Sequence, residues 1–410
     1  MLDGYPYGYL THPGDPKGSP YLGNWPHNLG DAYVGKALAN LLDIENYYVI
    51  TREAPKAAFD IINSECSAIV VLAQNALRYG WFEEHLPVSY LKKIKIPMVL
   101  ISLGVQFRYH EEIRLSVGDI ESLQWLHANS ASSQVRGHIS AELLASVGIK
   151  NARVLGCPSL LAANDIAQPL LAPTLDNSAY LLTDMGALPD IHHWQFRIIE
   201  QLEQMSQKTS VVCQGGEYVL QDYIRARDGD SLVRTQTLDA LSGAALSTSQ
   251  FGYVEDSERS LLKVSVEKAS TADLEASVRW YYRDLSDNAL DTLVKGSISA
   301  ATTSELRRYA RDWSVALSSR LHGGILALNE GTPTAFAVHD YRLQELVELY
   351  RLPNINFDRT RAPDIEQFFA DLTWPDLAEL RTQTQASFRA FFDENNVPHT
   401  LPQPSAGEVV

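Results

Sequence analysis

The stretch that decides the fold is WSVALSSRLHGGILALNEGTPTAFAVHDYRLQELVELYRL, residues 313–352. Two apolar runs, 313–319 and 333–340, are each followed by a segment whose apolar residues recur at helical spacing. Short apolar runs that alternate with helical segments predict parallel strands joined by crossover helices. The stretch therefore predicts a strand, a helix from Leu321 to Asn329, a second strand, and a helix over 342–352.

The same alternation extends in both directions along the chain. Further strands are predicted at 47–50, 67–73, 97–104, 132–136, 152–156, 178–184, 209–214 and 250–256. Further helices are predicted at 31–42, 54–64, 121–130, 138–148 and 192–207, with helical segments filling 257–311 and a terminal helix over 376–395. This pattern predicts an α/β fold with two doubly wound, Rossmann-like domains that face each other across a cleft.

A chain of 410 residues is too long for one ordinary core, so two domains are expected. We assign residues 1–170 to an N-terminal α/β domain and residues 171–375 to a C-terminal α/β domain. The stretch 157–177, rich in Pro and Ala, is interpreted as the exit into a linker. Residues 376–410 are expected to form a helix that packs back on the body, followed by a flexible tail.

The composition excludes several classes of protein. The chain has 50 Asp and Glu against 34 Lys and Arg, a formal net charge of −16, which argues against a general nucleic-acid-binding surface. Its 3 cysteines include no CxxC pair, so neither a disulfide framework nor a zinc ribbon is predicted. Because the sequence has no basic start followed by an apolar run and no apolar stretch of about 18 residues, we expect a cytoplasmic protein without a membrane span.

Polar residues and glycines gather where the strand 313–319 ends. Arg320 offers a rigid fork of donors to a carboxylate or phosphate, and His322 can donate a proton near neutral pH. Gly323 and Gly324 let a ligand approach the backbone at the start of a helix, where free N–H groups favour an anion. Taken singly, Arg320 also fits a helix cap and His322 a satisfied core residue. Together with Ser319 they predict an anion site.

Three motifs are spread along the chain. They are Ser319-Arg320-Leu321-His322-Gly323 with Gly331-Thr332-Pro333 and Asp340, then Asn28-Leu29-Gly30-Asp31, and finally Val135-Arg136 with Ser140 and Gly148-Ile149. Together they resemble the polysaccharide pyruvyl transferase family over roughly residues 24–353. One position departs from the family pattern, since Gly137 stands where an acidic residue is common. A role that the carboxylate of this acidic residue has in the family is therefore either absent from this chain or taken by another residue.

The resemblance implies transfer of an enolpyruvyl unit from phosphoenolpyruvate to two hydroxyls of one sugar in a polysaccharide or glycan precursor. A cyclic pyruvate ketal and phosphate would be the products. We expect an arrangement similar to the GT-B fold, with no metal, and phosphoenolpyruvate would serve as donor substrate instead of a cofactor. His322 and Arg320 are carried over as catalytic residues. Arg320 would bind the donor's charged groups, and His322 would deliver a proton or stabilise phosphate. The C-terminal domain would thus bind the donor, and the N-terminal domain, residues 1–170, is expected on the acceptor side.

The resemblance also supplies a set of expected substrate-binding residues. They are Arg136, Ser319, Gly323, Gly324, Asn28, Gly30, Asp31 and Asp340. Arg136 would either complete an anion clamp across the cleft or form an interdomain salt bridge. Asn28 is expected to cap the first long helix, and Asp31 either lies in its first turn as a favourable charge or accepts a proton from a sugar hydroxyl.

Two other functions remain open at this point. A GT-B-type glycosyltransferase would bind the diphosphate of a nucleotide sugar at the same helix start, and a non-catalytic glycan-binding protein would retain the fold alone. The expected partners are phosphoenolpyruvate and a sugar or glycan acceptor, free or lipid-linked, without nucleic acid. A peripheral position at the inner face of the cell membrane fits these partners, and the oligomeric state stays open.

Overall fold

The computed structural model describes residues 29–43, 56–66, 68–109, 111–162, 174–183, 189–214, 218–228, 271–283, 285–300, 302–361 and 363–403. The strands predicted at 47–50 and 250–256 lie outside these residues, as does Asn28. All statements below concern the described part of the chain.

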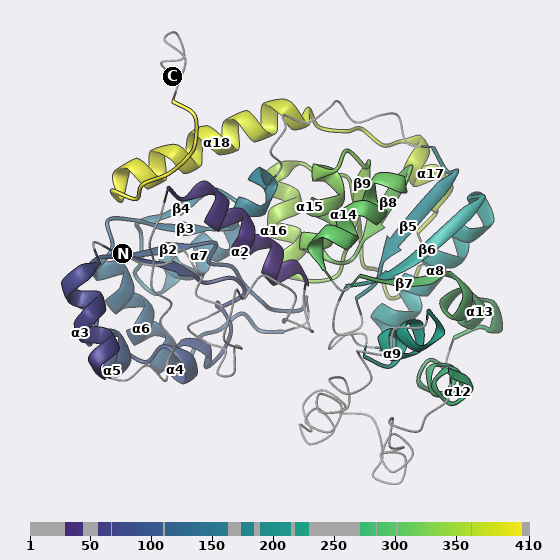
Figure 1. Ribbon diagram of the computed structural model, residues 1–410, viewed down its shortest axis with the longest axis horizontal. Helices are drawn as coiled ribbons and strands as arrows, with labels where there is room; N and C mark the ends of the chain where they lie inside the picture. Colours follow the sequence, from purple (N-terminus) through teal and green to yellow (C-terminus); the bar gives the residue numbers. More distant parts are fainter. Residues whose placement is uncertain are drawn as a thin grey trace.

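The N-terminal half is built from short parallel strands and the helices between them (Figure 1). In chain order its elements are α2 (Leu29–Leu41), α3 (Lys56–Glu65), β1 (Ile69–Leu72), α4 (Trp81–His85), α5 (Val88–Leu91), β2 (Met98–Ile101), α6 (Val117–Ala128), β3 (Ser133–Val135), α7 (His138–Ser146), β4 (Ala152–Val154) and the 3₁₀ helix η1 (Pro158–Leu161). β1 pairs with β2 and β3 with β4, both in parallel, and a parallel bridge between Leu103 and Val135 places β2 beside β3. The four strands predicted between residues 67 and 156 are confirmed, whereas α4 and α5 were not predicted.

The C-terminal half contains a six-stranded sheet whose described pairings are all parallel. Its elements are β5 (Asn177–Leu181), α8 (Pro189–Met205), β6 (Lys208–Cys213), α9 (Tyr218–Arg227), α12 (Thr271–Tyr281), α13 (Asp287–Gly296), β7 (Ser297–Ser299), α14 (Thr303–Asp312), β8 (Val315–Ser318), α15 (Leu321–Asn329), β9 (Thr334–Val338), α16 (Tyr341–Tyr350) and β10 (Asn354–Asn356). The strand order is β10-β9-β8-β5-β6-β7, so the chain winds outward from the centre in two opposite directions. The direction changes between β5 and β8, and such a switch point opens a crevice at the carboxyl ends of the two strands.

Two sequence predictions in these regions were wrong. The stretch 257–311, predicted as helical throughout, contains β7, a three-residue edge strand too short to produce a period-2 signal. The start of the predicted linker 157–177 is core, because Cys157 and the residues of η1 are buried. The α/β class with parallel sheets is confirmed, while the GT-B arrangement and the domain boundaries at residues 170 and 375 stay predictions.

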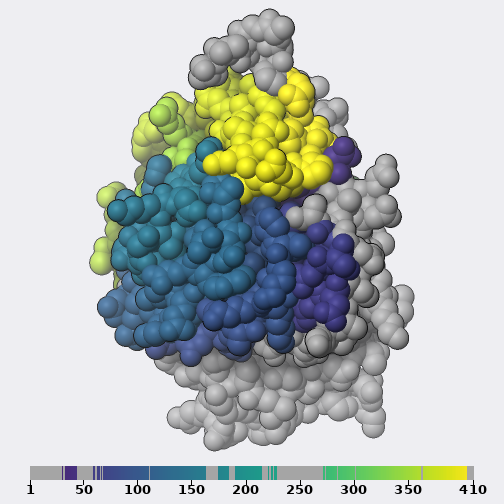
Figure 2. Space-filling model, turned by 90° about the vertical axis from the view of Figure 1, so that its left-hand side faces the viewer, coloured from purple at the N-terminus to yellow at the C-terminus, as the bar shows by residue number. Residues whose placement is uncertain are grey.

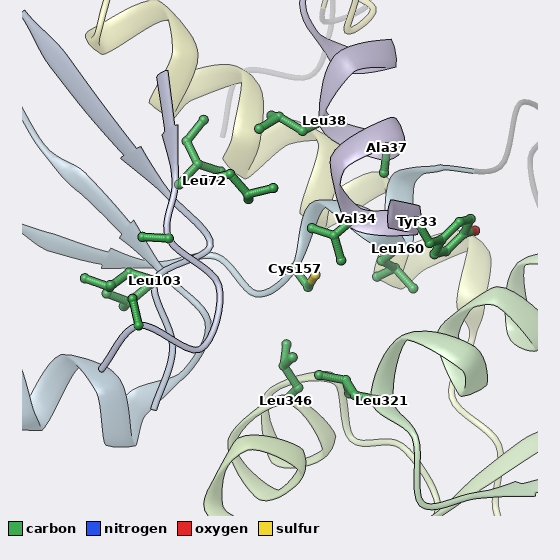
Figure 3. Packing of buried hydrophobic residues seen from close by; sticks show 14 of the residues in the cluster. Tyr33, Val34, Ala37, Leu38, Leu72, Leu103, Cys157, Leu160, Leu321 and Leu346 are labelled. Atoms are coloured by element: carbon green, nitrogen blue, oxygen red, sulfur yellow. The ribbon is translucent and has the colours of Figure 1, made fainter. Parts of the chain in front are cut away.

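One hydrophobic cluster runs through both halves. It includes Val34 of α2 and Leu160 of η1 from the N-terminal half, together with Leu321 of α15 and Leu346 of α16. Figure 3 shows Leu321 and Leu346 facing Cys157 across this cluster. The two sets of strands are therefore joined by packed side chains at the point where α15 begins.

The chain ends in α17 (Ile365–Ala370) and the long helix α18 (Leu377–Glu394), which returns over the N-terminal half (Figures 1 and 2). Phe388 and Phe391 are fully buried, as expected for a terminal helix that packs back on the body. Asn395 donates to Ser132 over 3.0 Å, and the carboxylate of Glu394 lies 2.7 Å from Arg153. The C-terminal end of α18 is thus held beside β3 and β4.

Candidate active site

The start of α15 lies at the switch point of the six-stranded sheet. β8 delivers Ser318, Ser319 and Arg320 there, and Arg320 occupies the N-cap position with extended backbone. No side-chain hydrogen bond caps this helix, so the N–H groups of its first turn are available to a ligand. Because these groups carry the positive end of the helix dipole, the position favours an anion.

Arg136 and His322, which are 186 positions apart in the sequence, meet at this place. Arg136 follows β3 and is fully buried, and its Nη2 lies 3.1 Å from Nε2 of His322. Its Nε donates to the hydroxyl of Ser102 over 2.9 Å, and its Nη1 to the amide oxygen of Asn75 over 2.7 Å. Among the described residues, Arg136 forms no ion pair with a carboxylate, so the predicted alternative of an interdomain salt bridge is not found there.

Two residues that hold Arg136 have backbone conformations in the left-handed region. Asn75 has a φ of 53° and Ser102 a φ of 61°, both in the left-handed region. Asparagine tolerates this region, whereas serine adopts it at a cost of about 1–3 kcal/mol. Backbone strain of this kind concentrates at sites where side-chain placement matters, and here it places two oxygen acceptors on one guanidinium.

His322 is neutral in this environment. Burial is the largest cause that lowers its pKa well below the usual 6.5, and the positive charges of Arg136 and Arg342 lower it further. A guanidinium can only donate hydrogen bonds, so Nε2 of His322 accepts from Arg136. The proton of the neutral ring is therefore on Nδ1, and Nε2 holds a lone pair.

Cys157, which the sequence analysis did not identify, completes the surroundings of His322. Its Sγ lies 3.7 Å from Nε2 of His322 and accepts from the hydroxyls of Ser159 over 3.1 Å and Ser102 over 3.8 Å. Its position shortly after β4, at the carboxyl end of a strand, is the one signal in the sequence that identifies it as a candidate.

Arg320 and Ser319 lie directly before α15 and are both buried. Nε of Arg320 donates to the carbonyl oxygen of Leu182 over 2.9 Å, which anchors its side chain to the end of β5. The hydroxyl of Ser319 lies 2.8 Å from the carbonyl oxygen of Leu181 and 2.7 Å from Oε1 of Gln195. Ser319 therefore links β8 to β5, and its hydroxyl proton is engaged within the fold.

The two glycines of α15 allow close approach in two directions. A Cβ on Gly324 would lie 2.5 Å from the ring of Phe336, so this glycine lets the helix pack directly on β9. A Cβ on Gly323 would lie 1.9 Å from Oε1 of Gln214, a residue at the end of β6 that is 3% exposed. That amide oxygen has no hydrogen-bond partner among the described residues, so a buried acceptor without a partner stands beside the first turn of α15.

Asp340 caps α16 and organises the neighbouring strand end. Its Oδ1 accepts from the N–H of Leu343 over 2.8 Å, while its Oδ2 lies 3.2 Å from Arg342 and 3.9 Å from His339. Burial lowers the pKa of His339, as it does for His322. Arg342 was not predicted as a site residue, yet its charge acts directly on His322.

The predicted residues of the first helix are placed only in part. Gly30 is buried in the first turn of α2, and the backbone of Asp31 belongs to the same turn. Asn28 lies outside the described residues. Helix α2 packs on both η1 and α15, so this helix lies in the region where the two halves meet.

A family model described as polysaccharide pyruvyl transferase matches residues 28–341. The chain belongs to this family. The part matched by the pyruvyl transferase model contains Arg136, Arg320, His322 and Asp340, and membership implies a transferase that acts on polysaccharide. No curated protein matches the chain.

Among solved structures, the chain is similar to a functionally uncharacterized protein from Klebsiella pneumoniae subsp. pneumoniae. The identity is 11%, the TM-score is 0.38, and the match covers 81% of this chain and 90% of the other.

Within the described ranges, no helix is both long and apolar enough to cross a membrane. The same residues include no group of three or more His, Cys, Asp or Glu side chains arranged to hold a metal ion.

Proposed function

We propose that the protein transfers a pyruvyl group from phosphoenolpyruvate to two hydroxyls of a sugar in a polysaccharide or glycan precursor, forming a cyclic ketal and releasing phosphate. The observation that carries this proposal is the contact between Arg136 and His322 at the uncapped start of α15. It combines a buried cation without an ion-paired carboxylate, a titratable ring and free helix N–H groups in one place.

The charge of the site supports an anionic donor. Arg136 and Arg342 both act on His322, and Arg320 acts on the neighbouring His339. Phosphoenolpyruvate carries a carboxylate and a phosphate, and two or three arginines match these planar and tetrahedral groups. In a site shielded from water such interactions are stronger than on the surface.

The proposed reaction balances without a further reactant. A proton adds to the methylene carbon of the donor, and the oxygen of one sugar hydroxyl forms a bond to the neighbouring carbon. The bond between that carbon and the phosphate oxygen breaks, and the second hydroxyl closes the ring. The two hydroxyl protons account for the new methyl hydrogen and for the proton on the released hydrogen phosphate.

We assign proton delivery to His322. Its pKa is low in the unliganded site because of burial and two arginines. A bound anion offsets the charges of these arginines, so it raises the pKa of His322 and favours the imidazolium that a general acid requires. We place the reaction in the cytoplasm, where phosphoenolpyruvate is available, with the acceptor free or lipid-linked.

The decisive experiment measures donor binding and product in parallel. A thermal-shift series compares phosphoenolpyruvate with a panel of nucleotide sugars, since a ligand of the native state raises the melting temperature. Ketal formation on a panel of defined sugars is followed by NMR through the new methyl signal. Stabilisation by phosphoenolpyruvate together with a methyl signal supports the proposal. Stabilisation by a nucleotide sugar alone would instead indicate a glycosyltransferase.

A matched pair of variants locates the site. Arg136→Ala is expected to abolish the stabilisation by phosphoenolpyruvate, whereas Arg359→Ala, which removes an exposed arginine paired with Asp190, retains it. Equal stabilisation of both variants would contradict the placement of the donor at Arg136.

A further inference from the structure

Glu345 is a buried carboxylate at the contact between the two halves. It lies on α16, is 1% exposed, and accepts from the N–H of Ser140 over 3.1 Å and from its hydroxyl over 2.7 Å. Ser140 lies in the first turn of α7, the helix that begins directly after Arg136 and Gly137. The carboxylate therefore acts as a cap for a helix of the opposite half.

Two glycines make room for this carboxylate beside Arg136. A Cβ on Gly137 would lie 2.5 Å from Cβ of Glu345, so no other residue fits there without moving α16. A Cβ on Gly104 would lie 2.7 Å from Cδ of Arg136 and 3.3 Å from Oε1 of Glu345. The stem of the arginine and the carboxylate thus lie against the same glycine.

Arg136 needs a counter-charge that its direct partners do not supply. Among the described residues, its guanidinium contacts only neutral groups, the oxygens of Ser102, Asn75 and Gln74 and the ring of His322. A buried charge without compensation is strongly unfavourable. Burial raises the pKa of Glu345 to about 7, while the hydrogen bonds from Ser140 and the positive charge of Arg136 act in the opposite direction and lower it.

The other charged groups near Glu345 are exposed or already paired. On α7, His138 and Glu142 are exposed. At the end of β9, Asp340 pairs with Arg342, and on α16 itself Glu348 is exposed. His339 and His322 are both kept neutral by burial. The segment 102–105 that packs between the two halves has no ionisable side chain.

We propose that Glu345 is the internal counter-ion of Arg136 and that an anionic donor replaces it in this role, so that Glu345 takes up a proton when the donor binds. The inference rests on the proposed function only in that the donor is an anion held at Arg136. The proton comes from solvent and adds to a carboxylate oxygen, and no bond to the donor forms. Glu345 is thus a positioning residue that sets the charge of the site without contacting substrate.

The test is isothermal titration calorimetry of the full chain with phosphoenolpyruvate at pH 7.5, in two buffers with different ionisation enthalpies. The difference between the two measured enthalpies gives the number of protons taken up. With a pKa of about 7, roughly three-quarters of Glu345 is ionised at this pH and available for protonation. We expect the wild type to take up more protons per bound donor than Glu345→Gln, by up to roughly three-quarters of a proton. Glu348→Gln is expected to behave as the wild type.

Ser140→Ala provides a second measurement that does not depend on the folding of Glu345→Gln. Loss of the hydroxyl that donates to the carboxylate raises the pKa of Glu345, so the uptake decreases at pH 7.5 and its maximum moves to higher pH. Equal uptake in the wild type and Glu345→Gln, or an unchanged pH profile in Ser140→Ala, would overturn the inference while donor binding persists. Absence of phosphoenolpyruvate binding to the wild type would overturn the proposed function, and this inference with it.

Discussion

Replacement of Glu345 by glutamine tests the environment of this carboxylate without any substrate. Glutamine keeps the shape and an amide oxygen that can accept from Ser140, but it cannot ionise. The variant therefore removes the titration of one buried group and leaves the packing of α16 on α7 largely in place. Its effect appears in how the free energy of unfolding depends on pH.

The magnitude follows from two pKa values. The carboxyl titrates near its ordinary 4.5 in the unfolded chain, whereas burial raises the pKa of Glu345 to about 7 in the folded protein. The folded state binds the proton more tightly, so this group favours folding below pH 4.5, and the contribution is lost as pH rises to about 7. Between pH 5 and 8 the loss amounts to about 2.5 kcal/mol.

The assay is urea denaturation at several pH values between 5 and 8, with unfolding followed by circular dichroism. We expect the free energy of unfolding of the wild type to decrease by about 2.5 kcal/mol relative to Glu345→Gln across this range. Glu348→Gln, three residues further along the same helix and exposed, is expected to change in parallel with the wild type. Parallel curves for the wild type and Glu345→Gln would refute the reasoning, because they would mean that Glu345 has the same pKa in both states.

The remaining predictions concern the site and the terminal helix. His322→Ala is expected to reduce ketal formation by about 10²–10⁴-fold with a circular dichroism spectrum like that of the wild type, and normal turnover would contradict its role in proton delivery. Arg320→Ala is expected to weaken binding of phosphoenolpyruvate by roughly 10–100-fold, the loss of one charged hydrogen bond, and an unchanged affinity by calorimetry would exclude it from the donor site. Phe388→Ala, at a fully buried position of α18, is expected to lower the free energy of unfolding by about 3–5 kcal/mol in urea, and a loss under about 1 kcal/mol would mean that α18 is only loosely docked.

The segment 313–352 was predictable because local and global signals agree there. The predicted helix has the bounds of α15, Leu321–Asn329, and the strands on either side are buried on both faces, as expected for the middle of a parallel sheet. By contrast, β7 and β10 are edge strands of three residues with only one buried position each. Such short pieces are strands only because a longer neighbour pairs with them, so their own sequence contains almost no signal.

Glu345 and Glu348 show why the site could be predicted only in part. Both lie on α16 and are separated by less than one turn, and the sequence assigns both to the polar side of an amphipathic helix. Helix α7 packs against α16 and buries Glu345, while Glu348 stays exposed. The difference in burial between the two glutamates thus comes from a helix that begins about 200 residues earlier. That helix also supplies Ser140, the hydrogen-bond partner of Glu345, which is 205 positions away in the sequence. A strand end or a helix start can be found from local sequence, but a contact between two halves cannot.

The choice of neutral partners for Arg136 has a consequence for ligand binding. A carboxylate in direct contact with this arginine would stabilise the empty site and would then compete with any incoming anion. Hydroxyl and amide oxygens hold the guanidinium in place without cancelling its charge. Glu345, which accepts a hydrogen bond from Ser140 and lies against Gly104, compensates that charge from a greater distance. A chain with a net charge of −16 can therefore present a local positive potential to a small anion. Because one half supplies Arg136 and the other supplies His322 and Glu345, this potential exists only where the two halves are packed together.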